Sequence, residues 1–346
     1  MKKIKINMYS KADTVEGQGV GSAYKEQVSI AKDLDGFEVT INGKHSNSYD
    51  IRHFHTVNPT FFTKIKKNRI NICYVHFIPV YDDGSLHMSK FAFKIYRKYV
   101  LDFYNKNDEL VVVNPYFINE LKKVGINPEK VTYIPNYVSK ERFNKLSSEE
   151  IAKAKAKYQI PKDQFVVLGV GQTQTRKGVL DFIEVAKQNK DMCFVWAGGF
   201  SFGKLTAGYE EIKKAMDNPP KNVKFIGIIP RADMNEVYNL ADVMFLPSYQ
   251  ELFPMTILEA VNLGVPMLLR DLELYEDILL NEYVKGTSNK EFCELLNKYK
   301  NDKSFYAHGQ EISNNISQYY SKENVSKLWS DYYTKIYNKY PNKHTK

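Results

Sequence analysis

The sequence predicts an α/β protein with two doubly wound, Rossmann-like parallel sheets, one in each half of the chain. Short β-rich runs alternate with amphipathic helical stretches along nearly all of its 346 residues. Such alternation is typical of βα units, in which crossover helices join parallel strands. At roughly 100–200 residues per domain, the length also predicts two domains. Because ligands of such folds bind at the carboxyl ends of the strands, we expect a cleft between those ends of the two sheets.

The expected strands are short runs rich in β-branched and aromatic residues. In the first half these runs are Ile4–Tyr9, Phe37–Ile41, Asn71–Phe77, Glu109–Val113 and Val131–Ile134. In the second half they are Phe165–Val170, Cys193–Ala197, Val223–Ile226, Val243–Leu246 and Pro266–Leu269. Stretches of helical length and periodicity lie between them, among them Ser22–Leu34, Val179–Asn189, Met234–Leu240 and Thr256–Leu263.

A change in composition predicts where the two domains meet. The segment Ser139–Tyr158 is charged, rich in Ala, Lys and Glu, and lacks β character. We therefore expect a boundary near residue 160, with a first domain over 1–160 and a second over 161–324. The remaining tail is helical and aromatic, with a helix expected over Val325–Tyr340.

Composition excludes several classes of protein. Hydrophobic residues make up 43% of the chain and charged residues 26%, which is ordinary globular usage and excludes wholesale disorder. The strongest apolar run, Ile72–Tyr81, is about half of the roughly 20 residues that span a bilayer. Polar and apolar residues alternate after Met1, so no signal-peptide core is expected. Cys73, Cys193 and Cys293 are odd in number and lack a CxxC pattern, which predicts reduced thiols in a cytoplasmic protein, without disulfides or zinc.

The net charge of +9 is concentrated in one part of the chain. Residues 51–100 contain nine basic and two acidic side chains and so carry +7 of it. The basic residues that matter most here are Lys64, Lys66, Lys67, Lys90, Lys94, Arg97 and Lys98. Within Ser89–Asn105 they alternate with aromatic residues at helical spacing, and Phe61-Phe62 beside Lys64 repeats that chemistry. This pattern is typical of a helix on an anionic membrane surface. An ordinary surface helix with its aromatics in the core fits equally well, and a nucleic-acid groove lacks any accompanying motif.

The strongest functional signal is the segment Pro247–Ala260, which follows the expected strand Val243–Leu246. Pro254 suits the first turn of a helix, where its missing N–H costs nothing. The free N–H groups of Met255 and Thr256 would then form an anion site, helped by the helix dipole.

Two glutamates flank that anion site. Glu251 precedes the helix and Glu259 lies inside it. Carboxylates bind phosphate poorly but accept hydrogen bonds from vicinal diols, which suits a nucleotide sugar with a diphosphate between a hexose and a ribose. The alternative is a capped surface helix with two solvated glutamates.

A glycine-bounded loop, Gly171–Gly178, follows the first expected strand of the second half. Its glycines allow close backbone approach, and Lys177 could neutralise a diphosphate as the sugar leaves. Arg176-Lys177 alone would be read as a solvated turn. Near the amino terminus, Gly17–Gly21 could suggest a dinucleotide site, but its spacing is not G-x-G-x-x-G.

These motifs resemble those of retaining GT-B glycosyltransferases of family 4. Glu251 and Glu259 match the family's E-x7-E signature, and Gly171–Gly178 matches its G-R-x4-K-G motif, with Gln172 in place of the arginine. Arg176 is the candidate to supply the missing cation. Further matches are Ile134–Val138, Val195–Gly199 and Val223–Pro230. The resemblance implies a GT-B fold in which the C-terminal helix crosses back onto the first domain.

The resemblance also implies roles for individual residues. His76, Lys177 and Glu251 are the expected catalytic residues, with His76 on the acceptor side and Glu251 on the donor sugar. The expected donor contacts are Gly21, Gly171, Gln172, Arg176, Lys177, Gly178, Ile229, Glu251, Phe253, Pro254, Met255, Thr256 and Glu259. The acceptor and membrane side is expected to use Gly19 and the basic residues Lys64, Lys66, Lys67, Lys90, Lys94, Arg97 and Lys98. No cofactor or metal is expected to be required, and Asp82-Asp83 is interpreted as a solvated turn.

Over the whole chain the sequence is most similar to the Gram-positive glycolipid glycosyltransferases that add a second hexose to α-monoglucosyldiacylglycerol. The product of those enzymes serves as a membrane glycolipid and as the lipoteichoic acid anchor. That likeness implies retaining transfer of galactose or glucose from a UDP-sugar, by a peripheral protein at the cytoplasmic face of the membrane. Two alternatives stay open: a soluble or cell-wall polymer acceptor, and a non-catalytic partner subunit, which only Gln172 supports. No nucleic-acid partner is expected.

Overall fold

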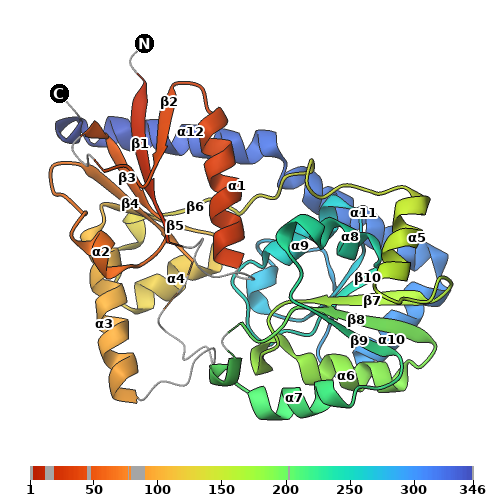
Figure 1. The fold of residues 1–346 in the computed structure, drawn as a ribbon. Helices are drawn as coiled ribbons and strands as arrows, with labels where there is room; N and C mark the ends of the chain where they lie inside the picture. The colour runs from red at the N-terminus through yellow and green to blue at the C-terminus, as the bar shows by residue number, and fades with distance from the viewer. Residues whose placement is uncertain are drawn as a thin grey trace. The chain divides into compact units, whose positions relative to one another are not determined.

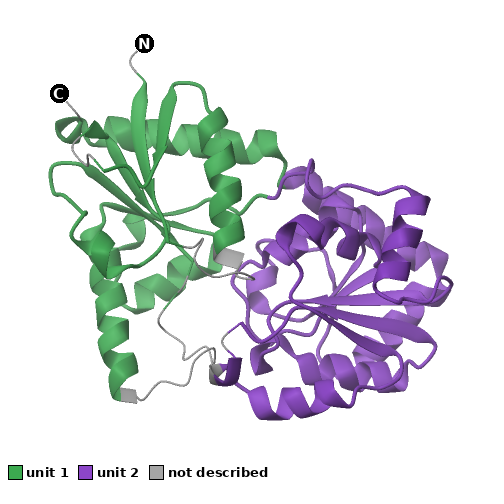
Figure 2. Ribbon diagram, in the orientation of Figure 1, with its two compact units in different colours: residues 1–82, 88–137, 320–346 green, residues 83–87, 138–319 purple. Residues whose placement is uncertain are grey.

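The computed structural model describes residues 3–11, 19–44, 48–76, 78, 90–201 and 203–344, which form two compact units. Of these residues, the first unit contains 3–78, 90–137 and 320–344, with the gaps just given, and the second contains 138–201 and 203–319 (Figure 2, green and purple). The chain therefore leaves the first unit after Tyr137 and returns to it at Tyr320.

The first unit is built on a six-stranded parallel sheet with the strand order β2-β1-β3-β4-β5-β6 (Figure 1). Its strands are β1 (Ile4–Tyr9), β2 (Phe37–Ile41), β3 (Ile51–Phe54), β4 (Ile70–Val75), β5 (Glu109–Val112) and β6 (Val131–Tyr133). Its helices are α1 (Gly19–Asp33), α2 (Pro59–Phe62), α3 (Lys90–Lys106), α4 (Tyr116–Lys123) and α12 (Lys322–Lys339).

Helices cover both faces of this sheet, because successive side chains of a strand point to opposite faces. On one face, the Phe54 ring lies 5.8 Å from Phe103 of α3, centroid to centroid. On the other, His53 lies 5.4 Å from Trp329 of α12, and Tyr74 lies at the same distance from Trp329. The C-terminal helix α12 thus forms part of the core of the first unit, as the family resemblance implied.

The second unit contains another six-stranded parallel sheet, in the order β12-β11-β10-β7-β8-β9. Its strands are β7 (Phe165–Val170), β8 (Met192–Ala197), β9 (Val223–Gly227), β10 (Val243–Leu246), β11 (Met267–Arg270) and β12 (Val284–Gly286). Its helices are α5 (Ser148–Lys157), α6 (Val179–Gln188), α7 (Tyr209–Asp217), α8 (Met234–Asn239), α9 (Met255–Asn262), α10 (Asn289–Asn301) and α11 (Lys303–Tyr319). Phe182, Trp196 and Phe245 pack together at the centre of its core.

The expected boundary near residue 160 lies inside the second unit, because the segment before it is tied to that unit. A capping box between Ser147 and Glu150 starts α5. Just before it, the Leu146 amide donates to Asn239 Oδ1 at 3.0 Å, and the Asn144 amide donates to Asn235 at 3.1 Å. The lack of β character in this segment was therefore a poor guide to the boundary, since a charged helix can belong to either domain.

All ten predicted strands are present, and four have the expected bounds: β1, β2, β7 and β10. The structure adds β3 and β12, which were not among the predicted strands. Arg52 and His53 within β3 are fully buried, so a strand of the core has the composition of a surface segment. The predicted strand Asn71–Phe77 ends at Val75, so His76 follows it directly, and Phe77 lies outside the described residues.

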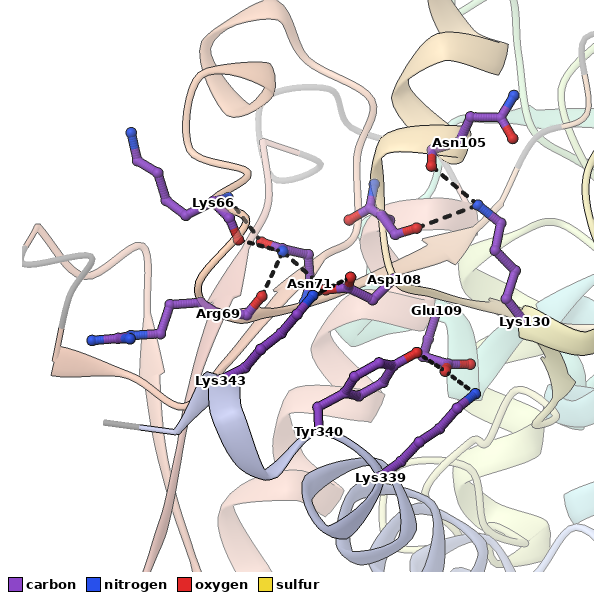
Figure 3. A network of polar contacts seen from close by, with 11 residues as sticks. Lys66, Arg69, Asn71, Asn105, Asp108, Glu109, Lys130, Lys339, Tyr340 and Lys343 are labelled. Atoms are coloured by element: carbon purple, nitrogen blue, oxygen red, sulfur yellow. Dashed lines mark hydrogen bonds and ion pairs between the residues drawn. The ribbon is translucent and has the colours of Figure 1, made fainter. Parts of the chain in front are cut away.

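The C-terminal end of the chain is held at the amino-terminal ends of β4 and β5 (Figure 3). Lys339 Nζ and the Tyr340 hydroxyl both bind Glu109 Oε1 at 2.6 Å, and Lys343 pairs with Asp108. Asp108 Oδ2 in turn accepts from the Asn71 amide at 2.9 Å. These contacts join the end of α12 to strands in the middle of the sheet.

A buried hydroxyl also joins α12 to this sheet, on the face that bears His53. The Tyr333 hydroxyl accepts a hydrogen bond from Gln27 Nε2 of α1 at 2.8 Å and lies 2.9 Å from His53 Nδ1 of β3. The neighbouring Tyr332 hydroxyl is also buried but has no hydrogen-bond partner among the described residues. Two adjacent tyrosines of one helix therefore differ in whether their hydroxyl is satisfied.

We expect Tyr333→Phe to lower the free energy of unfolding by about 1–3 kcal/mol, because it leaves Gln27 and His53 with unsatisfied buried groups. Tyr332→Phe is the matched control and should change that free energy by less than about 0.5 kcal/mol, or raise it, because it removes an unpaired hydroxyl. Equilibrium denaturation in urea measures both. Equal losses in the two variants would contradict the role assigned to the Tyr333 hydroxyl.

Candidate functional site

Lys177 and Glu251, two of the expected catalytic residues, form a buried ion pair. Lys177 ends the short turn η4 (Thr175–Lys177) after β7, and Glu251 lies in the loop after β10. Because β7 and β10 are parallel neighbours, the loops at their carboxyl ends meet. Lys177 Nζ lies 2.5 Å from Glu251 Oε1, and the side chains are only 12% and 5% exposed.

Burial and the neighbouring charges act on this pair in opposite directions. Burial alone would raise the pKa of Glu251, but Lys177 and Arg176 outweigh it and hold the pKa below its ordinary value. Burial lowers the pKa of Lys177, and Glu251 opposes that effect. Glu251 is therefore a carboxylate at neutral pH. Since an ammonium has three donors, Lys177 can bind Glu251 and still donate to an anion such as a phosphate.

Arg176 lies beside the Lys177–Glu251 pair and is linked through Gln174 to Gln172, which stands where the family has an arginine. Its Nε donates to Gln174 Oε1 at 3.0 Å, and Gln174 Nε2 donates to Gln172 Oε1 at 2.7 Å. Its Nη1 donates to the Gln250 carbonyl at 3.1 Å. The Arg176 charge lowers the pKa of both Lys177 and Glu251, so it acts directly on the pair. A second cation is therefore present here although Gln172 is neutral.

Gly178 is required where the two loops touch. Its φ of +68° lies in the left-handed region, which favours glycine. A Cβ on this residue would also lie 2.3 Å from the Pro247 carbonyl oxygen. On the other side of the loop, the Gly171 carbonyl accepts a hydrogen bond from Trp196 Nε1 at 3.0 Å. Both glycines therefore hold the loop against neighbouring backbone or core side chains.

Helix α9 begins beside this pair and leaves polar groups free at its start. It begins at Met255, with Pro254 as an extended N-cap, one position earlier than expected. The N–H groups of Met255 and Thr256, its first two residues, have no acceptor within the helix, whereas the Ile257 N–H donates to the Pro254 carbonyl at 3.1 Å. The Thr256 hydroxyl oxygen is buried without a hydrogen-bond partner among the described residues. Phe253 and Met255 are buried and fix the start of the helix in the core.

Glu259 is buried one turn further along α9 and is held by two residues that the sequence did not single out. Its Oε1 lies 2.5 Å from Arg231 Nη1, and its Oε2 accepts from the Tyr238 hydroxyl at 2.6 Å. A carboxylate offers about four lone pairs, so Glu259 can still accept hydrogen bonds from a diol. Arg231 comes two residues after the half-buried Ile229, and that position was its only signal in the sequence.

His76 lies in the first unit, directly after β4. Its ring packs on Tyr74 at 4.4 Å, centroid to centroid, and its Nε2 is buried without a hydrogen-bond partner among the described residues. Burial lowers the pKa of His76 to about 4, so the imidazole is neutral at pH 7. A neutral imidazole can accept or donate a hydrogen bond to a hydroxyl, which is the chemistry expected of it.

His53 and His55 of the neighbouring segment form a histidine cluster with His76. The rings of His53 and His55 lie 4.2 Å apart, and those of His55 and His76 are 6.2 Å apart and stacked. Burial lowers the pKa of His53 to about 3 and, together with its histidine neighbours, holds the pKa of His55 well below its ordinary value. Both histidines are fully buried core residues.

Two of the expected site residues, Gly19 and Gly21, lie within a helix and not in a loop before it. Helix α1 begins at Gly19, whereas the sequence indicated a start at Ser22. Both glycines therefore belong to its first turn, and Gly21 is buried. Gly17 and Gln18 of the same motif lie outside the described residues.

Helix α3 is divided between the core and the solvent. Val100 and Phe103 in its C-terminal half are buried, whereas Phe91 and Ile95 near its start are 75% and 56% exposed. The exposed half also carries three exposed basic residues, Lys94, Arg97 and Lys98. The C-terminal half therefore packs in the core as an ordinary surface helix does, whereas the N-terminal half leaves apolar and basic side chains exposed.

The other basic residues expected at the membrane have different surroundings. Lys66 and Lys67 are exposed. Lys64 is half-buried, with its ammonium 4.6 Å from the centre of the Tyr9 ring, and Phe61 beside it is buried. The expectation that Phe61 repeats the chemistry of α3 is therefore wrong, because Phe61 packs on Tyr9 in the core. Lys90 is the first residue of α3.

The described residues contain neither a metal-binding cluster nor a membrane-spanning helix. Within them, no three or more His, Cys, Asp or Glu side chains are grouped so that they could hold a metal ion. Among the described helices, none combines the length and apolarity needed to cross a bilayer. Asp82-Asp83 lies outside the described residues.

Sequence comparisons match both halves of the chain to glycosyltransferases. Residues 150–326 match the family described as glycosyl transferases group 1, and residues 40–142 match glycosyltransferase family 4. The chain is 43% identical to the alpha-galactosylglucosyldiacylglycerol synthase of Streptococcus pneumoniae, over 96% of this chain and 90% of the relative. It is 27% identical to the processive diacylglycerol alpha-glucosyltransferase of Acholeplasma laidlawii, over 85% of this chain and 88% of the relative.

Solved structures share the fold at much lower identity. Anabaena HepE in complex with UDP and glucose has a TM-score of 0.74 at 16% identity, over 96% of this chain and 99% of that one. Sucrose-phosphate synthase from Thermosynechococcus elongatus has a TM-score of 0.79 at 16% identity, over 97% of this chain and 100% of that one. These likenesses, with the two parallel sheets, confirm the expected fold class.

The histidine cluster predicts an acid-sensitive first unit. Because the folded pKa values of His53 and His76 lie below the ordinary 6.5, the unfolded chain binds more protons below that pH. Stability should therefore be full above pH 6.5 and fall as the pH drops towards 4, by about 1.4 kcal/mol per pH unit for each such histidine.

His55→Leu removes one of these histidines, whose two ring nitrogens have no hydrogen-bond partner among the described residues. Its free energy of unfolding, measured in urea from pH 7 to 4.5, should fall less steeply than that of the wild type. The matched control is His308→Leu, at a half-exposed side chain, and should keep the wild-type slope. Parallel curves for His55→Leu and the wild type would contradict the prediction.

Proposed function

Because the chain belongs to the group 1 glycosyltransferases, we propose that it transfers a hexose, with retention, from a UDP-sugar to a membrane glycolipid. The protein is a GT-B hexosyltransferase, and its relatives are named for α-linked glycolipid products. The observation that carries the proposal is the buried Lys177–Glu251 pair, at the carboxyl ends of two adjacent parallel strands and next to the start of α9.

The proposed donor is a UDP-hexose. HepE, which shares the fold, has been solved with UDP and with UDP-glucose. In this chain the diphosphate is proposed to bind Lys177, Arg176 and the first-turn N–H groups of α9. Glu251 is proposed to accept hydrogen bonds from the sugar, and Glu259, held by Arg231 and Tyr238, from the ribose diol. No cofactor or metal enters this proposal.

The proposed chemistry is front-face displacement, the usual account for this family. The bond between the sugar C1 and the diphosphate oxygen breaks, and its electron pair leaves with UDP. The acceptor hydroxyl oxygen bonds to C1 on the same face, which retains the α configuration, and its proton passes to the departing diphosphate. Lys177 stabilises the charge that develops on the leaving group. His76, as a neutral imidazole, is proposed to orient the acceptor hydroxyl.

The proposed acceptor is a glycolipid, with α-monoglucosyldiacylglycerol as the leading candidate and galactose or glucose as the hexose. The 43% identity to the pneumococcal alpha-galactosylglucosyldiacylglycerol synthase supports this choice, because it extends over nearly both whole chains. We propose that the protein works as a peripheral protein at the cytoplasmic face of the membrane. The exposed apolar and basic half of α3 supports that location.

The function is tested by incubating the protein with radiolabelled UDP-galactose or UDP-glucose and liposomes that contain diacylglycerol or its monoglucoside. We expect label in a diglycosyl lipid. Glu251→Gln should lower the rate by about 100- to 1,000-fold, the usual range for the loss of one group that binds in the transition state. Glu236→Gln is the control, because Glu236 also pairs with a lysine, Lys157, but on the surface.

Three outcomes would overturn parts of this assignment. No transfer to any lipid would exclude the glycolipid function. Equal transfer to soluble acceptors without lipid would favour the cell-wall polymer alternative. Full activity of Glu251→Gln would remove Glu251 from the proposed site.

A second experiment tests the membrane surface on α3. Replacing Lys94, Arg97 and Lys98 with Gln should weaken binding to anionic vesicles by roughly 100-fold, at about 1 kcal/mol per charge, and reduce the salt dependence of binding. The control makes the same change in charge at three exposed lysines elsewhere, Lys122, Lys162 and Lys190. Vesicle sedimentation at two salt concentrations measures both, and equal losses in the two triple variants would contradict a specific role for α3.

A further inference from the structure

We propose that Arg270 is a positioning residue that braces the two loops carrying Lys177 and Glu251, with Tyr249 stacked on its guanidinium. Arg270 is the last residue of β11 and is buried. It belongs to neither motif that predicted the site. The inference rests on the proposed function, because it concerns the same pair of residues.

Arg270 binds three separate elements of the second unit. Its Nε donates to the Pro247 carbonyl, just after β10, at 2.9 Å. Its Nη2 pairs with Asp181 Oδ2, in the first turn of α6, at 3.0 Å. Its Nη1 donates to the Thr287 carbonyl, just after β12, at 3.3 Å. Arg270 thus joins the carboxyl ends of β10 and β12 to α6, the helix that follows the loop Gly171–Gly178.

The bonded groups lie next to the proposed catalytic residues in the chain. Asp181 is in the helix that starts directly after Gly178, so holding it also holds the end of the loop that carries Lys177. Pro247 lies in the same loop as Glu251, four residues before it. The Pro247 carbonyl lies so close to Gly178 that a Cβ on Gly178 would clash with it. The Pro247 carbonyl is therefore fixed between Gly178 and Arg270. A shift of either loop would separate Lys177 from Glu251.

The exposed ring of Tyr249 stacks on the Arg270 guanidinium and separates it from solvent. The guanidinium carbon of Arg270 lies 3.9 Å from the centre of the Tyr249 ring and 5.2 Å from that of Phe292. Tyr249 is 54% exposed, and its hydrogen bond with Asp181 raises its pKa. Its amide donates to the Arg176 carbonyl at 2.7 Å, a second direct link between the two loops. An exposed aromatic ring is thus held in place two residues before Glu251.

This geometry requires an arginine. A guanidinium presents five donors in a rigid plane and stacks on aromatic rings, whereas a lysine ammonium is a point charge on a flexible stem. Arg270→Lys keeps the charge but cannot bind three elements in one plane. It therefore separates the bracing role from a purely electrostatic one.

The test compares Arg270→Lys and Tyr249→Leu with Lys285→Met as the control. Lys285 forms an ion pair at 2.9 Å with Asp271, the residue after Arg270, but it is exposed at the surface. We expect both brace variants to lower kcat for hexose transfer by about tenfold and to change the KM for the UDP-hexose by less than about threefold, because misplaced groups lose their stabilisation of the transition state first. Tyr249→Phe, which keeps the ring, should recover most of kcat.

A second readout does not depend on activity. Trypsin cleaves after Arg176 and Lys177, and a loosened loop should be cut there at least about fivefold faster in both brace variants. Lys285→Met should be cut at the wild-type rate. Since Tyr249 is exposed, its variant keeps the test valid if Arg270→Lys fails to fold.

Wild-type kcat and wild-type cleavage in both brace variants would overturn the proposal. Slower transfer without faster cleavage would also overturn it, because the loops would then not have moved. If the wild type transfers no hexose, the proposed function fails, but the cleavage rates still decide whether Arg270 holds the loops.

Discussion

The loops of the second unit depend on one buried ion pair, Lys177 with Glu251. Lys177 and Glu251 are almost fully enclosed by protein, and removing charges from water is costly unless they are paired in a fixed geometry. The loops that carry Lys177 and Glu251 must therefore adopt one fixed geometry in the folded protein. The glycine at 178, the backbone bond from Tyr249 to Arg176, and Arg270 behind them all serve that requirement. A ligand anion that reaches Lys177 joins a site that is already assembled, so little ordering remains to be done on binding.

The first unit differs in that its core contains a buried layer of polar side chains. Three histidines and several tyrosines lie between its sheet and the helices α1 and α12, and burial keeps the histidines neutral. Tyr333 satisfies two of the polar groups in that layer, which lets a helix from the far end of the chain complete the core. His76 lies at the edge of the layer, and its Nε2, like ring nitrogens of His53 and His55, has no hydrogen-bond partner among the described residues.

Much of this architecture could be predicted from the sequence because it depends on local pattern. Alternating β-rich runs and helical periodicity indicated two parallel sheets. The motifs that contain Lys177 and Glu251 singled out two residues that the structure brings together as an ion pair. What could not be predicted depends on contacts between distant residues. Arg231 and Tyr238 hold Glu259, and Arg270 reaches Asp181 at the start of α6, yet none of them belongs to a local motif.

Some local patterns were also misleading. Strand β3 buries Arg52 and His53, so its core position is hidden by a polar composition. Phe61 beside Lys64 suggested a second basic and aromatic surface, because the residue types of the pair do not reveal that Phe61 faces the core. The start of α1 was placed too late because glycines usually indicate a loop, whereas tertiary context overrides that propensity at Gly19 and Gly21.

The return of α12 to the first sheet has a consequence for how the protein is made. The strands of that sheet leave the ribosome early, but Trp329 and Tyr333, which cover one of its faces, follow the whole second unit in the chain. Until α12 is made, α1 alone among the described helices covers the face that bears His53 and Tyr74, while every described residue of the second unit has already emerged. The half of the protein that is translated first is therefore the half that finishes folding last, and during that interval its incompletely covered sheet is the surface most in need of a chaperone.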